Sequence, residues 1–267
     1  MSEFGKRHPP DADLLTIDVG NSSVHLGVVA GGDVTATRSV SPAEMDTLGE
    51  TLTTLWSELD ASAVRRVVVG SVVPRTLRTV REAAMRVLEE DVLVVGEQID
   101  LPMAIALDRP ERVGVDRICC AAAAFDTLQQ ACVVADFGTA ITIDLVGDDG
   151  MFLGGTISPG LQLSALSLAE HTAALTEIDI HVPEKVLGDD TESAIRSGVV
   201  YAAVGALREI TERYAETLNK WPMLVASGGD AELIAGQSDI IDRVVPDLCL
   251  RGLALAYRLQ AAPSNVL

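Results

Sequence analysis

Apolar segments of strand length alternate with amphipathic segments of helical length along most of the chain. The segment 14–29, "LLTIDVGNSSVHLGVV", has two apolar stretches around a polar centre, which predicts a hairpin of two strands. Pro in the pair Ser41-Pro42 is typical of a helix start. The first half is thus predicted to contain a hairpin (14–29), a helix (42–59), a strand (64–73), a helix (75–90) and a short strand (92–95).

The second half has the same alternation of strands and helices. A helix begins near Asp116 and is almost wholly apolar through Phe125, which predicts a buried helix. A second cycle starts at Cys132 with two strands and a hairpin turn over 147–150. Helices over 161–175 and 191–218, a strand over 222–227 and a further helix complete the prediction. This alternation indicates an α/β protein.

The two hairpins resemble each other around Asp18 and Asp136. "TIDVGNSSVHLGVV" aligns with "VADFGTAITIDLVG": each has an apolar strand, Asp-apolar-Gly, small residues and a second strand. Identity is low, so a coincidence of two strands is the alternative. An internal duplication is favoured. It predicts two similar domains around a central cleft, with a flexible tail at 1–12, an N-terminal domain at 13–130 and a C-terminal domain at 131–267.

The polar residues of these turns suit a phosphate ligand. Glycine lets a ligand approach the main chain, and exposed N–H groups, helped by hydroxyl and amide side chains such as those of Asn21, Thr139 and Thr142, form an anion-binding concavity. Carboxylates beside phosphate make sense with a cation, because Mg²⁺ is commonly held by one or two carboxylates plus substrate phosphates. Asp18 and Asp136 are therefore candidate cation ligands. The alternative is that Asp and Gly only form the hairpin turns.

Composition narrows the class of protein. The 267 residues include 48% hydrophobic and 22% charged residues, as in globular proteins, and neither a signal peptide nor a membrane-spanning run is visible, so a soluble intracellular protein is expected. The net charge of −19 disfavours binding to nucleic acid or to anionic membranes. Four cysteines without metal-ligand spacing are predicted to be reduced core residues.

The motifs together carry a family resemblance. "DVGNS" and "DFGTA" resemble the phosphate-binding turns of actin-like (ribonuclease H-like) kinases, and with "GVDR", "GGTISPG" and "SGGDA" in this order the chain resembles the type III pantothenate kinases. The resemblance implies a duplicated actin-like fold. It also implies phosphorylation of pantothenate to 4′-phosphopantothenate by ATP in the cytoplasm, the first step of coenzyme A biosynthesis, with Mg²⁺, a monovalent cation (K⁺ or NH₄⁺) and a homodimer.

The resemblance assigns the nucleotide contacts to the two turns. Asp18 is placed near Mg²⁺, Asp136 at the monovalent cation, and Thr139 at ATP. The whole segment of the first turn is expected to bind ATP: Asp18, Val19, Gly20, Asn21, Ser22, Ser23, Val24 and His25.

The resemblance assigns the acceptor site to residues between and after the turns, with Asp116 as the catalytic proton acceptor. Pantothenate contacts are expected from Leu107, Gly114, Val115, Asp116, Arg117 and Thr191. Leu107 stands where the family has a tyrosine, so that contact lacks a hydroxyl. From the residues alone, Asp116 could instead be an N-cap of its helix, and Arg117 could form a salt bridge.

Two other functions stay open at this point. One is a nucleotide-binding accessory protein without kinase activity, and the other is a small-molecule kinase of the same superfamily with a different acceptor. The segment "ICCAAAAF" could be a subunit interface or ordinary core.

Overall fold

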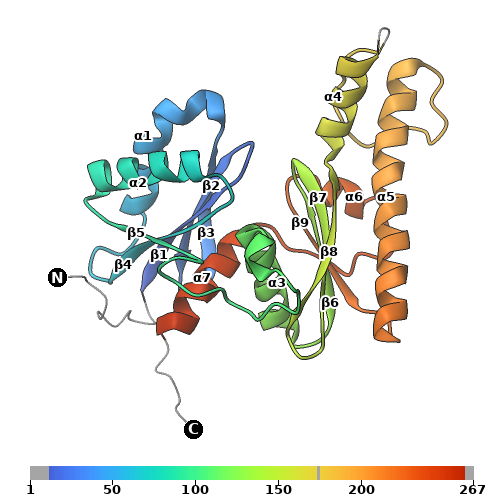
Figure 1. Cartoon of the computed structure of the whole chain (residues 1–267). Helices are drawn as coiled ribbons and strands as arrows, with labels where there is room; N and C mark the ends of the chain where they lie inside the picture. The colour runs from blue at the N-terminus through green and yellow to red at the C-terminus, as the bar shows by residue number, and fades with distance from the viewer. Residues whose placement is uncertain (1–11, 173–174, 262–267) are drawn as a thin grey trace. The chain divides into compact units, whose positions relative to one another are not determined.

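A computed structural model describes residues 12–172 and 175–261 (Figure 1). The chain divides into two compact units. The first comprises the described residues up to Ala104, Arg109–Ala123 and the segment from Asp247, and the second comprises Ile105–Asp108 and Ala124–Pro246. The predicted tail, 1–12, lies outside the described residues except for Ala12.

The first unit is built on a five-stranded sheet with the order β3-β2-β1-β4-β5. β1, β2 and β3 are antiparallel neighbours, and β4 and β5 continue the sheet in parallel. The strands are β1 (Asp13–Val19), β2 (Val24–Ala30), β3 (Asp33–Val40), β4 (Arg65–Ser71) and β5 (Val92–Val94). The helical segments are η1 (Pro42–Thr47), α1 (Leu48–Ser57), α2 (Pro74–Leu88), η2 (Pro110–Arg112), α3 (Val115–Leu128) and α7 (Leu248–Ala261). The end of α3, from Ala124, belongs to the second unit.

Alternation along the strands gives the first sheet two different faces (Figure 1). Leu15, Ile17 and Val19 of β1 face α1 and α2 and form one buried cluster with them. The other face carries Asp18, and α7 packs on it. Gly27 of β2 and Gly70 of β4 make room for this helix, since an added Cβ would lie 2.6 Å from Leu250 Cδ1 and 2.8 Å from Leu253 Cδ2, respectively.

The second unit repeats this topology with the order β8-β7-β6-β9-β10. Its strands are β6 (Cys132–Phe137), β7 (Ala140–Val146), β8 (Phe152–Pro159), β9 (Met223–Ser227) and β10 (Arg243–Val244). Its helices are α4 (Leu161–His171), α5 (Thr191–Leu218) and α6 (Ala231–Ala235) (Figure 1). Their apolar side chains form one buried cluster with the sheet.

The strand registers establish the internal duplication. Asp18 pairs with His25 across β1/β2 and with Gly70 of β4, and Asp136 pairs in the same way with Thr142 and Ser227. A register shift in β2 between Val28 and Val29 has its counterpart in β7 between Leu145 and Val146. In both strands the shift falls between the third and fourth residues after the cross-strand partner of the aspartate. Such agreement is not expected from a coincidence of two strands, so the predicted duplicated α/β fold is confirmed.

The limits of the units differ from the predicted domains at the C-terminus. The predicted range 131–267 included the last helix, whereas α7 packs on the first sheet and belongs to the first unit. The physical reason is that α7 is apolar on most sides, with Leu250, Leu253 and Tyr257 fully buried, and the Asp18 face of the first sheet needs a cover.

The four cysteines are free and buried, as predicted. Burial raises the pKa of the Cys132 thiol to about 12, which keeps it protonated at neutral pH. Within the described residues, no helix has the length and apolar character needed to cross a membrane.

Candidate active site

The first turn follows β1 at the carboxyl end of that strand. Asp18 is half-buried on the sheet face that α7 covers, whereas Asn21 and Ser22 are exposed. The Gly20 N–H donates to the Ser23 carbonyl over 3.0 Å, which closes the turn and leaves the side chains at its tip open to a ligand. The geometry thus has the small, exposed donors that a phosphate group needs.

His25 is the cross-strand partner of Asp18, and its ring is engaged on both sides. Nε2 lies 2.7 Å from Asp247 Oδ1 and Nδ1 lies 2.8 Å from Ser39 Oγ. A carboxylate only accepts hydrogen bonds, so Nε2 carries a proton toward Asp247. The family resemblance places His25 among the expected ATP contacts. In this structure its ring joins β2 to the start of α7 and to β3.

Asp116 lies in the first turn of α3. Since α3 begins at Val115, Asp116 is a helical residue and does not occupy the N-cap position that the sequence left open. Its Oδ1 accepts the Arg117 N–H over 2.8 Å. The same oxygen lies 2.3 Å from the place a Cβ of Gly114 would take, so a side chain at position 114 would displace the carboxylate. The "GVDR" motif is therefore one local structure that sets the direction of Asp116.

Two observations place the start of α3 near the first turn. Val115 Cγ1 lies 3.6 Å from the Cβ position of Gly70, and Gly70 is the neighbour of Asp18 in the sheet. A hydrogen bond with Cys249 lowers the pKa of the buried Cys119 thiol, but burial and the negative charges of Asp18 and Asp116 outweigh it and raise the pKa. The nucleotide and acceptor candidates of the first unit are thus close to each other.

The second turn follows β6 and has the same construction. Asp136 is half-buried and Thr139 is exposed, and the Gly138 N–H donates to the Ala140 carbonyl over 3.1 Å. After the fourth strand of each unit, a backbone N–H returns to the last residue of the first strand. Val72 donates to Val19 over 3.2 Å, and Asp230 donates to Phe137 over 3.0 Å.

Two glycines that sequence reasoning left without a role surround the second turn. A Cβ on Gly160 would lie 2.1 Å from the Gly138 carbonyl oxygen, and one on Gly228 would lie 2.4 Å from Asp136 Oδ1. Gly228 also has a φ of +92°, which disfavours other residues. Gly160 belongs to the motif "GGTISPG" and Gly228 to the motif "SGGDA". Their contacts are with residues distant in the sequence, so these contacts could not be predicted from the motifs.

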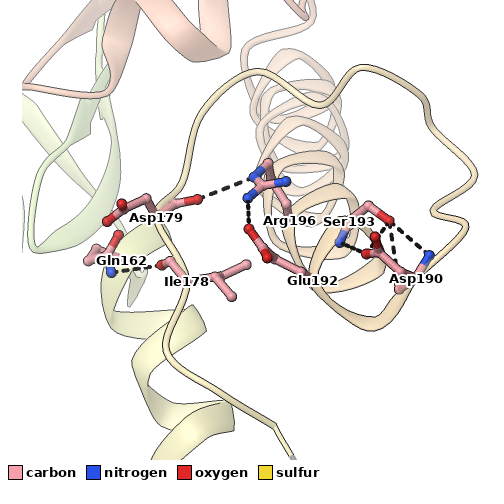
Figure 2. A network of polar contacts seen from close by, with 7 residues as sticks. All are labelled: Gln162, Ile178, Asp179, Asp190, Glu192, Ser193 and Arg196. Atoms are coloured by element: carbon pink, nitrogen blue, oxygen red, sulfur yellow. Dashed lines mark hydrogen bonds and ion pairs between the residues drawn. The ribbon is translucent and has the colours of Figure 1, made fainter.

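Thr191 is the first residue of α5 and is exposed. A polar network fixes its surroundings (Figure 2). Asp190 accepts from the Ser193 N–H over 2.7 Å and caps the helix, while Arg196 bonds to Glu192 over 2.6 Å and to the Asp179 carbonyl over 3.2 Å. Thr191 also lines a groove of about 850 Å³ between α4 and α5.

Leu107 lies on a short segment that is attached to β8. The neighbouring Ala106 N–H donates to the Phe152 carbonyl over 2.9 Å. Leu107 Cδ2 comes within 3.4 Å of the Cβ position of Gly154, and the side chain is 37% exposed. An exposed isobutyl group here offers an apolar surface to a ligand.

The predicted site residues thus form two groups. The structure brings the first turn together with "GVDR" in the first unit, and it places the second turn, Leu107 and Thr191 in the second unit.

The described residues contain no group of three or more His, Cys, Asp and Glu side chains that could hold a metal ion by themselves. Mg²⁺ does not need such a group, because it typically keeps several waters and binds through one or two carboxylates plus substrate phosphates. Asp18 and Asp136, each at the end of a first strand, are the carboxylates placed for such a role.

The fold and the two turns define the class of protein. Two copies of one sheet topology, each with an acidic glycine turn after its first strand, form the duplicated actin-like fold. The chain belongs to the type III pantothenate kinase family, whose model matches residues 14–213.

Relatives of this family match over almost their whole length. The type III pantothenate kinase of Dehalococcoides mccartyi (strain CBDB1) is 38% identical over 251 residues, which cover 92% of this chain and 95% of that protein. The one of Anaeromyxobacter sp. (strain Fw109-5) is 36% identical over 249 residues, covering 91% and 98%, respectively.

Solved structures agree on the fold. Component A of (R)-2-hydroxyglutaryl-CoA dehydratase from Acidaminococcus fermentans has a TM-score of 0.53 at 11% identity, covering 94% of this chain and 100% of that one. The ethanolamine utilization protein EutJ from Carboxydothermus hydrogenoformans has a TM-score of 0.51 at 16% identity, covering 91% and 88%, respectively. At such identities the likeness concerns the fold alone.

Proposed function

We propose that the protein transfers the γ-phosphoryl group of ATP to the primary alcohol of pantothenate, giving 4′-phosphopantothenate and ADP. This is the first step of coenzyme A biosynthesis, and we place it in the cytoplasm. The observation that carries the proposal is the match of almost the whole chain to pantothenate kinases, in a fold that sets Asp116 near the first turn.

The two turns are proposed to bind the phosphates of ATP. The exposed Asn21 and Ser22 side chains, the backbone N–H groups beside them and the Thr139 hydroxyl are the donors. Bound Mg²⁺ would neutralise phosphate charge, with Asp18 as its protein ligand. Asp136 is the proposed ligand of a monovalent cation, K⁺ or NH₄⁺. Because the protein carries a net charge of −19, such local features must hold the anionic nucleotide.

Asp116 is proposed to accept the proton of the pantothenate alcohol. The alcohol oxygen forms a bond to the γ-phosphorus, the bond from this phosphorus to the β,γ-bridging oxygen breaks, and ADP leaves. One carboxylate oxygen of Asp116 is held by the Arg117 N–H, so the second can face the alcohol. The Arg117 guanidinium suits the substrate carboxylate, and Gly114, Val115, Leu107 and Thr191 are the further proposed substrate contacts.

The substitution Asp116→Asn tests this role. We expect pantothenate-dependent ADP formation, measured in a coupled assay with ATP, Mg²⁺ and K⁺, to fall about a hundredfold or more, since a positioned proton acceptor contributes about 10²–10⁴. The matched control is Asp126→Asn, an exposed carboxylate on the same helix, with unchanged turnover expected. Normal turnover in Asp116→Asn would remove the assignment.

Leu107 favours one alternative within the same chemistry. Where the family has a tyrosine, this exposed isobutyl group would suit a more apolar acceptor. Phosphorylation rates measured for a panel of alcohols that includes pantothenate test this alternative. An alcohol that is phosphorylated markedly faster than pantothenate would replace pantothenate as the proposed acceptor. ATP binding by calorimetry without turnover of any acceptor would instead favour a non-catalytic accessory protein.

We also propose a homodimer that uses the groove between α4 and α5. Small residues of α5, Ala194, Gly198 and Ala202, line this groove, and Leu163 and Leu168 of α4 are 43% and 37% exposed. Such an apolar surface is typical of a subunit interface. Sedimentation is expected to give twice the mass of 28.1 kDa.

The substitution Gly198→Arg checks the position of this interface. A Cβ on Gly198 has no atom within 4 Å, so the monomer accommodates the side chain, whereas a partner in the groove would not. We expect particles of single mass from this variant. Single-mass particles from the unmodified protein would exclude the dimer.

A further inference from the structure

Asp230 lies in the loop that follows β9 and packs against the second turn. Its N–H donates to the Phe137 carbonyl over 3.0 Å, and a Cβ on Gly228, two residues earlier, would lie 2.4 Å from Asp136 Oδ1. Two independent contacts therefore fix this loop against the turn that is proposed to bind ATP. Asp230 has no part in the phosphoryl transfer described above.

The carboxylate of Asp230 has no structural partner in the described part of the chain. It accepts no hydrogen bond as a cap of α6, and it forms no ion pair with any described residue. It is nevertheless partly buried, and burial raises its pKa. An unpaired carboxylate withdrawn from water lowers the stability of the fold. A residue that costs stability without a contact is typical of a ligand-binding position.

The chemistry of the position selects the ligand group. A carboxylate accepts hydrogen bonds and repels phosphate, so it suits a donor on the nucleotide away from the phosphates. The neighbouring Gly229 is exposed, and nothing lies within 4 Å of its Cβ position, so a bulky group can approach the loop. A ribose offers two adjacent hydroxyl donors at a short distance from the phosphates.

We infer that Asp230 accepts hydrogen bonds from the ribose hydroxyls of the nucleotide and makes the site selective for ribonucleotides over deoxyribonucleotides. The inference rests on the proposed ATP-dependent function. It adds a specificity-determining residue to that site.

The test compares the affinities of ADP, 2′-deoxy-ADP and 3′-deoxy-ADP by calorimetry with the full chain. We expect ADP to bind about tenfold or more tightly than at least one deoxy analogue, since a hydrogen bond to a charged group is among the stronger ones. Asp230→Ala is expected to lower the affinity for ADP to that of this analogue and to remove the preference. The matched control is Glu232→Ala, an exposed carboxylate two residues further on, which should keep it.

A merely structural role for Asp230 predicts different results. Removing an unpaired carboxylate should leave the melting temperature of Asp230→Ala and Asp230→Asn unchanged or raised, whereas loss of a structural contact would lower it. Equal affinities for ADP and both deoxy analogues in the unmodified protein, or a preference that survives in Asp230→Ala, would overturn the inference. Because binding needs no acceptor, a protein that binds ADP selectively but does not phosphorylate pantothenate would fail the proposed function and still support Asp230.

Discussion

Glycine marks the places where two backbones approach most closely. Gly252 of α7 lies against α3, where a Cβ would be 2.0 Å from the Cys119 carbonyl oxygen and 2.6 Å from Cys119 Cα. Backbone atoms cannot move aside as the end of a side chain can. The contact holds α7 to α3, whose first turn contains Asp116. A small residue outside the proposed acceptor site therefore supports that site.

The substitution Gly252→Ala is expected to lower the free energy of unfolding by about 1–3 kcal/mol or more, because the added methyl group forces the two helices apart. Denaturant unfolding followed by circular dichroism measures the effect. Gly205→Ala on α5 is the matched control, since nothing lies within 4 Å of its Cβ position and alanine favours a helix by about 1 kcal/mol. Equal stabilities of the two variants would contradict the close contact.

At the residue scale, the sequence alone predicted the candidate site residues that can be recognised from their neighbours along the chain. Asp18 and Asp136 stand out because each follows an apolar strand and precedes a glycine. The ring contacts of His25 were not predictable, since Asp247 lies 222 positions away. That the Asp230 carboxylate has no partner among the described residues could not be predicted either, because it depends on which side chains the fold brings near it.

At the scale of elements, periodicity predicted the helices and strands with strong apolar patterns, and α5 was placed from Thr191 to Leu218 as observed. The predicted helix over 42–59 is split into η1 and α1. β3 was missed because it pairs only with β2 at the edge of the sheet, so its residues are largely polar. α7 and the two-residue β10 were also not predicted as separate elements.

The N-terminus of α5 gives a prediction for pH dependence. The hydrogen bonds from the Ser193 backbone and hydroxyl lower the pKa of Asp190 below 3.8. The folded pKa is thus below the unfolded one, so this cap stabilises the protein above the unfolded pKa and the stabilisation is lost as the pH falls through the folded pKa. We expect Asp190→Ala to lower the melting temperature near neutral pH and to have little effect at a pH below the folded pKa of Asp190.

Asp190→Asn separates the cap from its charge. Asparagine caps helices about as well as aspartate, so this variant should retain most of the stability near neutral pH while losing the acid-dependent part. A melting-temperature difference between Asp190→Ala and the unmodified protein that stays constant down to acidic pH would contradict the role of the ionised cap.

At the scale of the whole molecule, two copies of one topology explain why the chain carries its polar motifs in pairs. Each copy places an aspartate at the end of its first strand and a backbone hydrogen bond from the loop after its fourth. The sequence predicted this duplication from one pair of turns. It did not predict that α7 belongs to the first unit, because an apolar helix carries no mark of the sheet face that it covers.

A protein with a net charge of −19 can use an anionic nucleotide if local groups bind the phosphates. Backbone N–H groups and small hydroxyl side chains need no net positive charge to bind phosphate. The functional claim therefore depends on local geometry at the two turns and at Asp116 rather than on the overall electrostatic field.

Identification of the product decides whether the protein phosphorylates pantothenate. The protein is incubated with ATP, Mg²⁺, K⁺ and pantothenate, and phosphorus NMR follows the new phosphate ester. We expect a phosphomonoester on the primary alcohol of pantothenate, formed in equal amount with ADP and absent without enzyme. ADP formed without phosphorylated pantothenate, or no product while ATP binding is demonstrated, would contradict it.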